Sequence, residues 1–204
     1  MNCKHLRQLW GKGEIARPTK DTILPTDNLI QLTFHDFKFL DDPMPVLGEL
    51  PMFQRLVLSL EHASCKGLKM LYFEGGFSKL MFLILQRLEG LEEWEVEEGV
   101  MTKLLWLEIN RCWKLKMIPK GLSFVVSLQE LEISFMPSSF CRGWVPDPEN
   151  SWEKWPDFWK VKHVPRVKIS HVMASLLTSN WWGLSFNCRY FQDLIWVCVN
   201  TYRG

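Results

Sequence analysis

Apolar residues recur along the first two thirds of the chain with a spacing that fits neither a helix nor a strand throughout. In LLWLEINRCWKLKMIP, residues 104–119, they follow one another at steps of three, two, three, three and three. A helix repeats its apolar face at steps of three and four, and a strand at steps of two. The mixture predicts a short strand that buries Leu107 and Ile109, followed by a turn that returns more apolar residues to the same core. Such a coil needs copies of itself stacked beside it to bury its apolar face.

This pattern repeats. Cores of the form Leu-x-x-Leu-x-Leu, with other large apolar residues allowed, begin at Leu29, Phe53, Leu80, Leu104 and Leu128, and a weaker one begins at Leu6. Successive starts lie 23, 24, 27, 24 and 24 residues apart, within the period of about 20 to 29 residues that leucine-rich repeats have. The predicted fold class is therefore α/β: a leucine-rich-repeat solenoid (horseshoe) with a parallel concave sheet and an irregular or short-helical convex side. Its strands are expected at 29–34, 53–58, 80–85, 104–109 and 128–133.

Composition divides the chain into three regions. About six repeats fill residues 1–135. Residues 136–170 begin with three prolines, at positions 137, 146 and 148, and are interpreted as a C-terminal capping segment. Residues 171–204 form a tail without a clear apolar period, so no structure is predicted for it.

Charge and cysteine content indicate a protein of a reducing, intracellular compartment. Lys plus Arg is 24 and Asp plus Glu is 23, which gives no reason to expect nucleic acid or an anionic membrane as a partner. The start MNCKHLRQLW lacks the apolar run of a secretory signal, and no apolar stretch approaches the ~18 residues of a membrane span. Six cysteines show no disulfide or zinc spacing.

Signatures of catalysis or of metal binding are missing, so no enzyme, metal or cofactor is expected. The sequence has no phosphate-binding loop, no His-Glu-x-x-His and no Gly-x-Ser-x-Gly. His62 and Cys65 would supply only two of the four ligands of a structural zinc. Cys112 occupies the position where these repeats place Asn or Cys, which favours a buried structural thiol over a nucleophile.

The stretch EGLEEWEVEEG, residues 89–99, carries six glutamates. Its position after the Leu80 core places it on the loop-bearing side of the coil. A solvated acidic rim is favoured over a docking site for a basic partner, but both interpretations stay open.

Strand positions between the leucines are the candidates for binding. When Leu107 and Ile109 point into the core, Trp106 and Glu108 point outward, because alternate side chains of a strand face opposite ways. Two positions past their core triplets, one repeat apart, come two arginines that should be surface neighbours. Aromatic residues and arginine are over-represented among residues that dominate binding energy. The candidate protein-binding residues of the concave face are Arg55, Phe82, Ile84, Arg87, Trp106, Glu108, Arg111, Glu130 and Glu132.

Exposure of Phe82, Ile84 and Trp106 together is costly unless something covers them. A protein partner is one candidate. The tail or a neighbouring domain is the other, and the residues do not decide between them.

Three stretches of the sequence are informative together: GLEEWEVEEGVMTKLLWLEINRCWKLKMIPKGLSFVVSLQELEI, DDPMPVLGELP and DFWKVKHVP. In the same order, they resemble the last repeats and the terminal segment of plant intracellular immune receptors of the coiled-coil, nucleotide-binding, leucine-rich-repeat type. Similar phrases run through residues 25–168 and stop after Ile169.

The resemblance implies a cytoplasmic disease-resistance role. The repeats would recognise a pathogen protein, or a host protein that it has altered, and would hold the receptor's nucleotide-binding module inactive. That module and the coiled coil would precede the repeats, so ATP or ADP binding is not carried over. The alternative is a non-functional, truncated receptor remnant whose solenoid lacks a polar cap at its open end.

Overall fold

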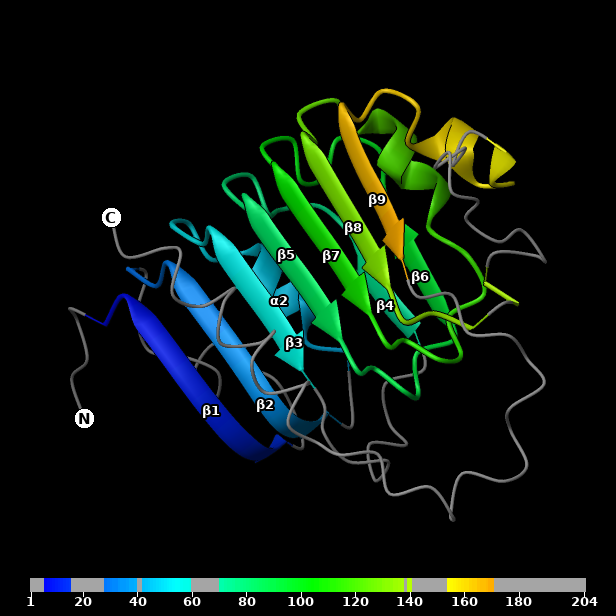
Figure 1. The fold of residues 1–204 in the computed structure, drawn as a ribbon. Helices are drawn as coiled ribbons and strands as arrows, with labels where there is room; N and C mark the ends of the chain where they lie inside the picture. Colours follow the sequence, from blue (N-terminus) through cyan, green and yellow to red (C-terminus); the bar gives the residue numbers. More distant parts are fainter. Residues whose placement is uncertain are drawn as a thin grey trace, which may run out of the picture. The chain divides into compact units, whose positions relative to one another are not determined.

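The computed structural model describes residues 6–15, 28–39, 42–59, 70–137, 139–140 and 154–170. Within these ranges seven strands form one sheet in which neighbours pair in parallel (Figure 1). Their order is β1 (Gln8–Ile15), β2 (Gln31–Phe39), β3 (Arg55–Ser59), β5 (Phe82–Gln86), β7 (Trp106–Asn110), β8 (Glu130–Ser134) and β9 (Arg166–Ser170). The single parallel sheet predicted from the repeat is therefore confirmed.

The five predicted strands begin two residues later than expected, because the first apolar residue of each repeat core lies in the turn before its strand. Leu104 is fully buried, and its amide donates to Met101 O at 2.9 Å before β7 begins at Trp106. One repeat earlier, the Leu80 amide donates to Phe77 O at 3.1 Å. The amide of the first leucine thus forms the hydrogen bond of the turn that precedes the strand.

Stacked pairs of aliphatic side chains form the core under the sheet. Leu83, Leu107 and Leu131 are register partners in β5, β7 and β8, and all three are fully buried. Residues between the inward positions are only partly buried in the same strands. This alternation follows the two-residue period of a strand that has one face in the core.

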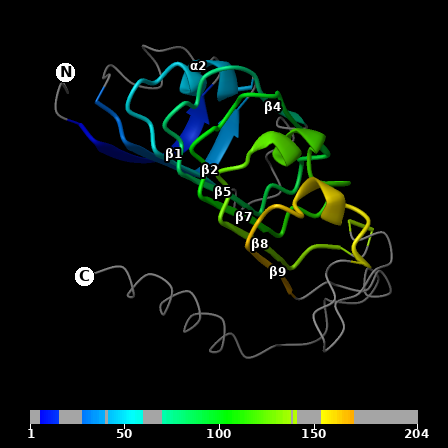
Figure 2. The same ribbon diagram turned by 90° about the horizontal axis from the view of Figure 1, so that it is seen from above.

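Short elements cover the other side of this core, as predicted for the convex side. They are α2 (Met44–Gly48), β4 (Met70–Phe73), β6 (Glu93–Val96) and the 3-10 helices η1 (Lys120–Phe124) and η3 (Phe158–Lys160), and Figure 2 shows that α2, β4 and the 3-10 helices lie on one side of the sheet. The parallel pairing of β4 with β6 was not predicted. Trp94 and Val96 of β6 are buried while Glu93 and Glu95 are exposed, so part of the glutamate-rich stretch is a strand with one apolar face.

Three strands end in the same unusual backbone conformation. Arg87, Arg111 and Phe135 directly follow β5, β7 and β8 and have φ of 54°, 53° and 54°. Their amides donate to the carbonyl oxygens of Asn110, Ser134 and Ser170, the last residues of the next strands, at 2.7, 3.2 and 3.2 Å. This left-handed conformation costs a residue with a Cβ about 1 to 2 kcal/mol. The chain therefore leaves the sheet through the same backbone bend after each of these three neighbouring strands.

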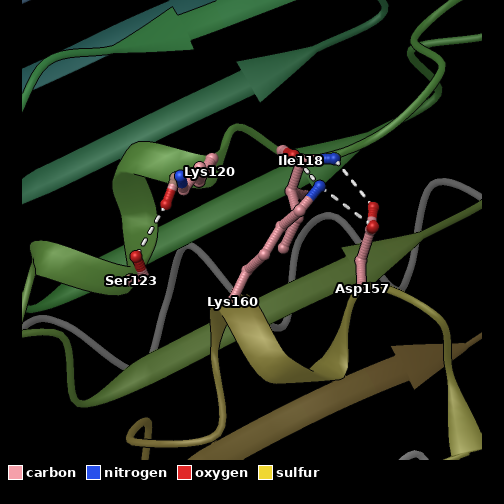
Figure 3. A network of polar contacts seen from close by, with 5 residues as sticks. All are labelled: Ile118, Lys120, Ser123, Asp157 and Lys160. Carbon is pink, nitrogen blue, oxygen red and sulfur yellow. Dashed lines mark hydrogen bonds and ion pairs between the residues drawn. The ribbon is translucent and has the colours of Figure 1, made fainter.

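Residues 154–170 close against the last repeats. β9 pairs with β8, and an ion pair between Asp157 and Lys160 contacts the main chain of Ile118 (Figure 3). The division at residues 135 and 170 stays a prediction. His62, Cys65 and residues 171–204 lie outside the described residues. Within the described ranges, no helix has the length and apolar character to cross a membrane.

Candidate protein-binding face

The register of the sheet arranges seven of the nine candidate residues in two rows that cross the strands. One row contains Arg55, Phe82, Trp106 and Glu130 and ends at Arg166. The next contains Val57, Ile84, Glu108 and Glu132 and ends at Lys168. Neighbouring strands lie about 4.8 Å apart, so side chains in one row contact their neighbours. We call the face that carries these two rows the outer sheet face.

An apolar cluster occupies the middle of the outer sheet face. Phe82 and Trp106 are register partners, Ile84 lies two residues after Phe82 on β5, and all three are partly buried. The Arg55 guanidinium lies over the Phe82 ring, 5.3 Å from its centroid. A cation over an aromatic face is attracted by the ring and held in a defined orientation. The cluster thus combines apolar contact area with an ordered positive charge.

Arg87 and Arg111 lie one position beyond the ends of β5 and β7, in adjacent coils as the repeat predicts. The Arg111 guanidinium stacks on the Phe135 ring with its central carbon 4.7 Å from the centroid. Partial burial lowers the pKa of Arg111, and the positive charge of Arg87 lowers it further. The two side chains are therefore close enough for their charges to interact.

Glu108 stands between the apolar cluster and the acidic end of its row. Burial raises the pKa of its carboxyl, and the neighbouring Glu132 raises it further, while Arg55 and Lys168 act in the opposite direction. Removing a carboxylate from water costs free energy that nearby positive charges offset only in part. The charge of Glu108 is thus costly to the folded protein.

Glu130 and Glu132 form ion pairs with the neighbouring strand β9. Arg166 Nη2 lies 2.8 Å from Glu130 Oε2, and Lys168 Nζ lies 2.9 Å from Glu132 Oε1. Sequence reasoning missed these contacts because it placed β9 in a capping segment. The available signal was the alternation of Arg166, Val167, Lys168 and Ile169, which is the pattern of a strand with a basic outer face.

The glutamate-rich stretch lies away from the outer sheet face, on β6 and its flanking turns. Lys116 Nζ is 3.0 Å from Glu93 Oε1. A cavity of about 420 Å³ is lined by residues 92–96, by residues 116–121 and by Lys160. Both signs of charge line this cavity, so it does not decide between an acidic rim and a docking site.

Cys112 is a structural thiol, as the repeat position predicts. It is fully buried, and its Sγ donates weakly to Leu85 O at 3.7 Å and to Asn110 O at 3.6 Å. Burial raises the pKa of the thiol to about 12. The thiolate needed for nucleophilic attack is therefore not formed near neutral pH.

Parallel strands at a 24-residue spacing, with buried aliphatic pairs and short elements behind them, define a leucine-rich-repeat solenoid. No protein-family model matches the chain, and no solved structure matches it significantly.

Three curated relatives, all from Arabidopsis thaliana, identify the kind of repeat protein. Disease resistance protein RPP8 is 37% identical over 129 residues, 63% of this chain and 13% of that protein. Disease susceptibility protein LOV1 is 34% identical over 169 residues, 83% of this chain and 17% of LOV1. Probable disease resistance protein RF45 is 38% identical over 138 residues, 68% of this chain and 12% of RF45. The chain is a homologue of plant disease resistance proteins and spans less than a fifth of the length of these three.

Proposed function

We propose that this chain is the protein-recognition part of a cytoplasmic plant immune receptor and binds its partner through the outer sheet face. The partner is a pathogen protein, a host protein that a pathogen has altered, or the nucleotide-binding module of a receptor of the same type. Its homology to disease resistance proteins supports the immune role. The role is binding and not catalysis, and it requires no cofactor.

One observation carries the choice of surface: Phe82, Ile84 and Trp106 form an apolar cluster on adjacent strands, bordered by arginines. Large aromatic side chains and arginines supply most of the binding energy in protein interfaces, particularly at the centre of a contact. Because these three side chains are already partly buried by their neighbours, little side-chain freedom remains to be lost on binding. The cluster therefore suits the central anchor of an interface.

The proposal is tested by binding in trans. The purified chain is titrated with the isolated nucleotide-binding module of a receptor of this type, and the dissociation constant is measured for wild type and for Trp106→Ala. We expect the substitution to weaken the complex by about 1 to 4 kcal/mol. Lys114→Ala, an exposed position in the turn after β7, is the control and should change affinity by less than about 0.5 kcal/mol. Equal affinities of wild type and Trp106→Ala would place the contact elsewhere.

The same preparation tests the alternative, a non-functional remnant. A recognition module should be monodisperse in solution. A remnant with an unsealed apolar end should aggregate, because solenoids need polar caps to stay soluble. Size-exclusion chromatography of the purified chain distinguishes the two.

A further inference from the structure

Glu108 lies in the middle of its row on the outer sheet face. Ile84 on β5 and Glu132 on β8 are its register partners. Trp106 precedes it by two residues on β7 and therefore points to the same side of the sheet. All four side chains are partly buried. Glu108 thus lies at the border between the apolar cluster and the charged residues of β8 and β9.

The carboxylates of this face differ in their counter-charges. Glu130 Oε2 lies 2.8 Å from Arg166 Nη2, and Glu132 Oε1 lies 2.9 Å from Lys168 Nζ. Glu108 forms no such ion pair within the part of the chain that the structure describes. Within these residues its charge therefore has no direct counter-charge.

Nearby positive charges compensate Glu108 only in part. Lys168 is already paired with Glu132, and the Arg55 guanidinium lies over the Phe82 ring. Both cations lower the pKa of Glu108, but burial and Glu132 raise it by more. The carboxylate is therefore less stable as an ion here than it is in water.

Asn110, the next outward residue of β7, orients this carboxylate. Its side chain hydrogen-bonds Glu108, and its Nδ2 donates to Ser134 Oγ at 3.0 Å. Its Oδ1 is buried and accepts no hydrogen bond within the described residues, so this part of β7 has more acceptors than donors. An acceptor that its neighbours already hold in place loses little freedom when a ligand binds.

A partner that covers the apolar cluster also covers Glu108. Ile84 lies about 4.8 Å from it across the strands, and Trp106 lies about 6.6 Å from it along β7. Burying a carboxylate without a counter-charge strongly opposes binding. A cation that the partner brings removes this penalty, and the exclusion of water strengthens the attraction between the two charges. The position of Glu108 therefore selects for a basic side chain in the partner.

A guanidinium group fits this position better than an ammonium group. It is planar, it stacks on aromatic rings, and its edge pairs with a carboxylate through two parallel hydrogen bonds. Trp106 offers the ring and Glu108 offers the carboxylate, on the same face of one strand. One arginine side chain can therefore contact both.

We propose that the partner carries an arginine whose guanidinium pairs with the Glu108 carboxylate and stacks on the Trp106 ring, beside an apolar side chain that packs on the rest of the apolar cluster. This inference rests on the proposed function and specifies the partner's chemistry. In an extended segment, side chains that share a face lie about 6.6 Å apart, which matches the spacing of the two contacts. The arginine and the apolar anchor are therefore expected two positions apart.

A display library of randomised peptides of about ten residues, longer than the span of both contacts, tests this. The whole chain is the bait. We expect enrichment of peptides that carry Arg two positions from Trp, Phe, Leu or Ile. The affinity of an enriched peptide should fall at least about tenfold for Glu108→Gln, and its dependence on salt should become weaker.

Two controls separate binding from folding and from net charge. Because burial already disfavours the charge of Glu108, Glu108→Gln should unfold at no lower denaturant concentration than wild type at pH 7. Glu98→Gln removes the same charge from an exposed turn after β6 and should bind the peptides as wild type does.

A matched change in the peptide tests the pairing itself. Citrulline has the shape of arginine but carries no charge. A peptide with citrulline in place of its arginine should bind wild type at least about tenfold more weakly, and it should bind wild type and Glu108→Gln alike. Equal losses from citrulline in both proteins would show that the arginine contacts another residue and would overturn the inference.

Two further results would overturn it. Enriched peptides without arginine, or with full affinity for Glu108→Gln, contradict the guanidinium site. If such peptides still depend on Trp106, the proposed function stands and only the inference fails. Absence of any enriched peptide means that the face binds no short segment, which also contradicts the inference, while the titration with the nucleotide-binding module judges the proposed function separately.

Discussion

Lys160 and Asp157 are joined by a buried ion pair in which Nζ lies 2.9 Å from Oδ1. Both side chains also bond the main chain of Ile118: Lys160 Nζ donates to Ile118 O at 2.8 Å, and the Ile118 amide donates to Asp157 Oδ2 at 3.3 Å (Figure 3). Ile118 lies 24 residues after Trp94 of β6, at the equivalent position of the next coil. A carboxylate and an ammonium group thus satisfy the backbone polar groups that a neighbouring strand would otherwise pair.

Lys160→Met tests how much this ion pair stabilises the folded protein. The substitution keeps the apolar stem but removes the ammonium group that contacts the buried Asp157 carboxylate, so we expect a loss of about 3 to 5 kcal/mol of unfolding free energy. Urea unfolding at neutral pH measures it. Lys162→Met, at an exposed position two residues along, should cost less than about 0.5 kcal/mol. Similar losses of unfolding free energy at both positions would mean that the ion pair does not hold residues 154–170 against the last repeats.

Leu107→Ala and Leu131→Ala test the stacked core. Both leucines are fully buried register partners of adjacent strands. Each substitution should cost about 2 to 5 kcal/mol, because it removes buried methyl groups and leaves a cavity between coils. Glu108→Ala, one residue along and facing outward, should cost little. Comparable losses at positions 107 and 108 in denaturant unfolding would show that the faces of the strand are assigned wrongly.

Glu108 gives the protein a predicted pH dependence. Its pKa is raised above the ordinary value of 4.5 by burial first and by Glu132 second, with Arg55 and Lys168 opposing and Asn110 donating a hydrogen bond. Between 4.5 and the raised pKa, the folded state holds a proton that the unfolded state has released. Stability contributed by this group is therefore complete below pH 4.5 and is lost as the pH rises through the raised pKa.

The neutral variant Glu108→Gln should lose this dependence. Relative to wild type, its unfolding free energy should increase as the pH rises from about 4 to 7. Chemical unfolding of both proteins across this range measures the difference. A difference that is constant with pH would show that Glu108 ionises alike in the folded and unfolded states.

Gly121 is required by a close approach of two chain segments. A Cβ at this position would lie 1.8 Å from Val96 O, where η1 packs against β6. Gly121→Ala must push these segments apart, so we expect a loss of about 1 to 3 kcal/mol or more. At Gly75, φ is +56° but a Cβ would meet no atom within 4 Å, so Gly75→Ala should cost only about 1 kcal/mol of backbone strain. Thermal unfolding compares the two, and the reverse order would contradict the packing at Val96.

Local repetition made the sheet predictable from the sequence. The Leu104, Leu107 and Ile109 pattern recurs in five units, and each unit places its aliphatic pair under the sheet. The predicted strand starts lay two residues too early because burial alone does not distinguish the first apolar residue of a core from the next two. The first lies in the turn before the strand, and the next two lie in the strand. Periodicity therefore located the coils, and hydrogen bonding decided where each strand begins.

Long-range contacts were not predictable in the same way. Asp157 bonds a residue 39 positions earlier, and Lys160 one 42 positions earlier, outside the repeat period. The ion pairs of Glu130 and Glu132 with β9 required knowledge that β9 joins the sheet. The candidate residues on β5 and β7, in contrast, followed from alternation alone, because the register of the repeat brings them together.

We propose that a protein partner covers the apolar cluster of the outer sheet face. Hydroxyl-radical footprinting tests it by measuring the oxidation of aromatic side chains in the chain alone and in its complex with the nucleotide-binding module. Phe124 and Trp159, which are 45% and 49% exposed, lie on 3-10 helices on the other side of the core and serve as internal controls. We predict that the complex lowers the oxidation of Phe82 and Trp106 and leaves both controls unchanged. Protection of Phe124 or Trp159, with Phe82 and Trp106 oxidised as in the free chain, would show that the partner binds elsewhere.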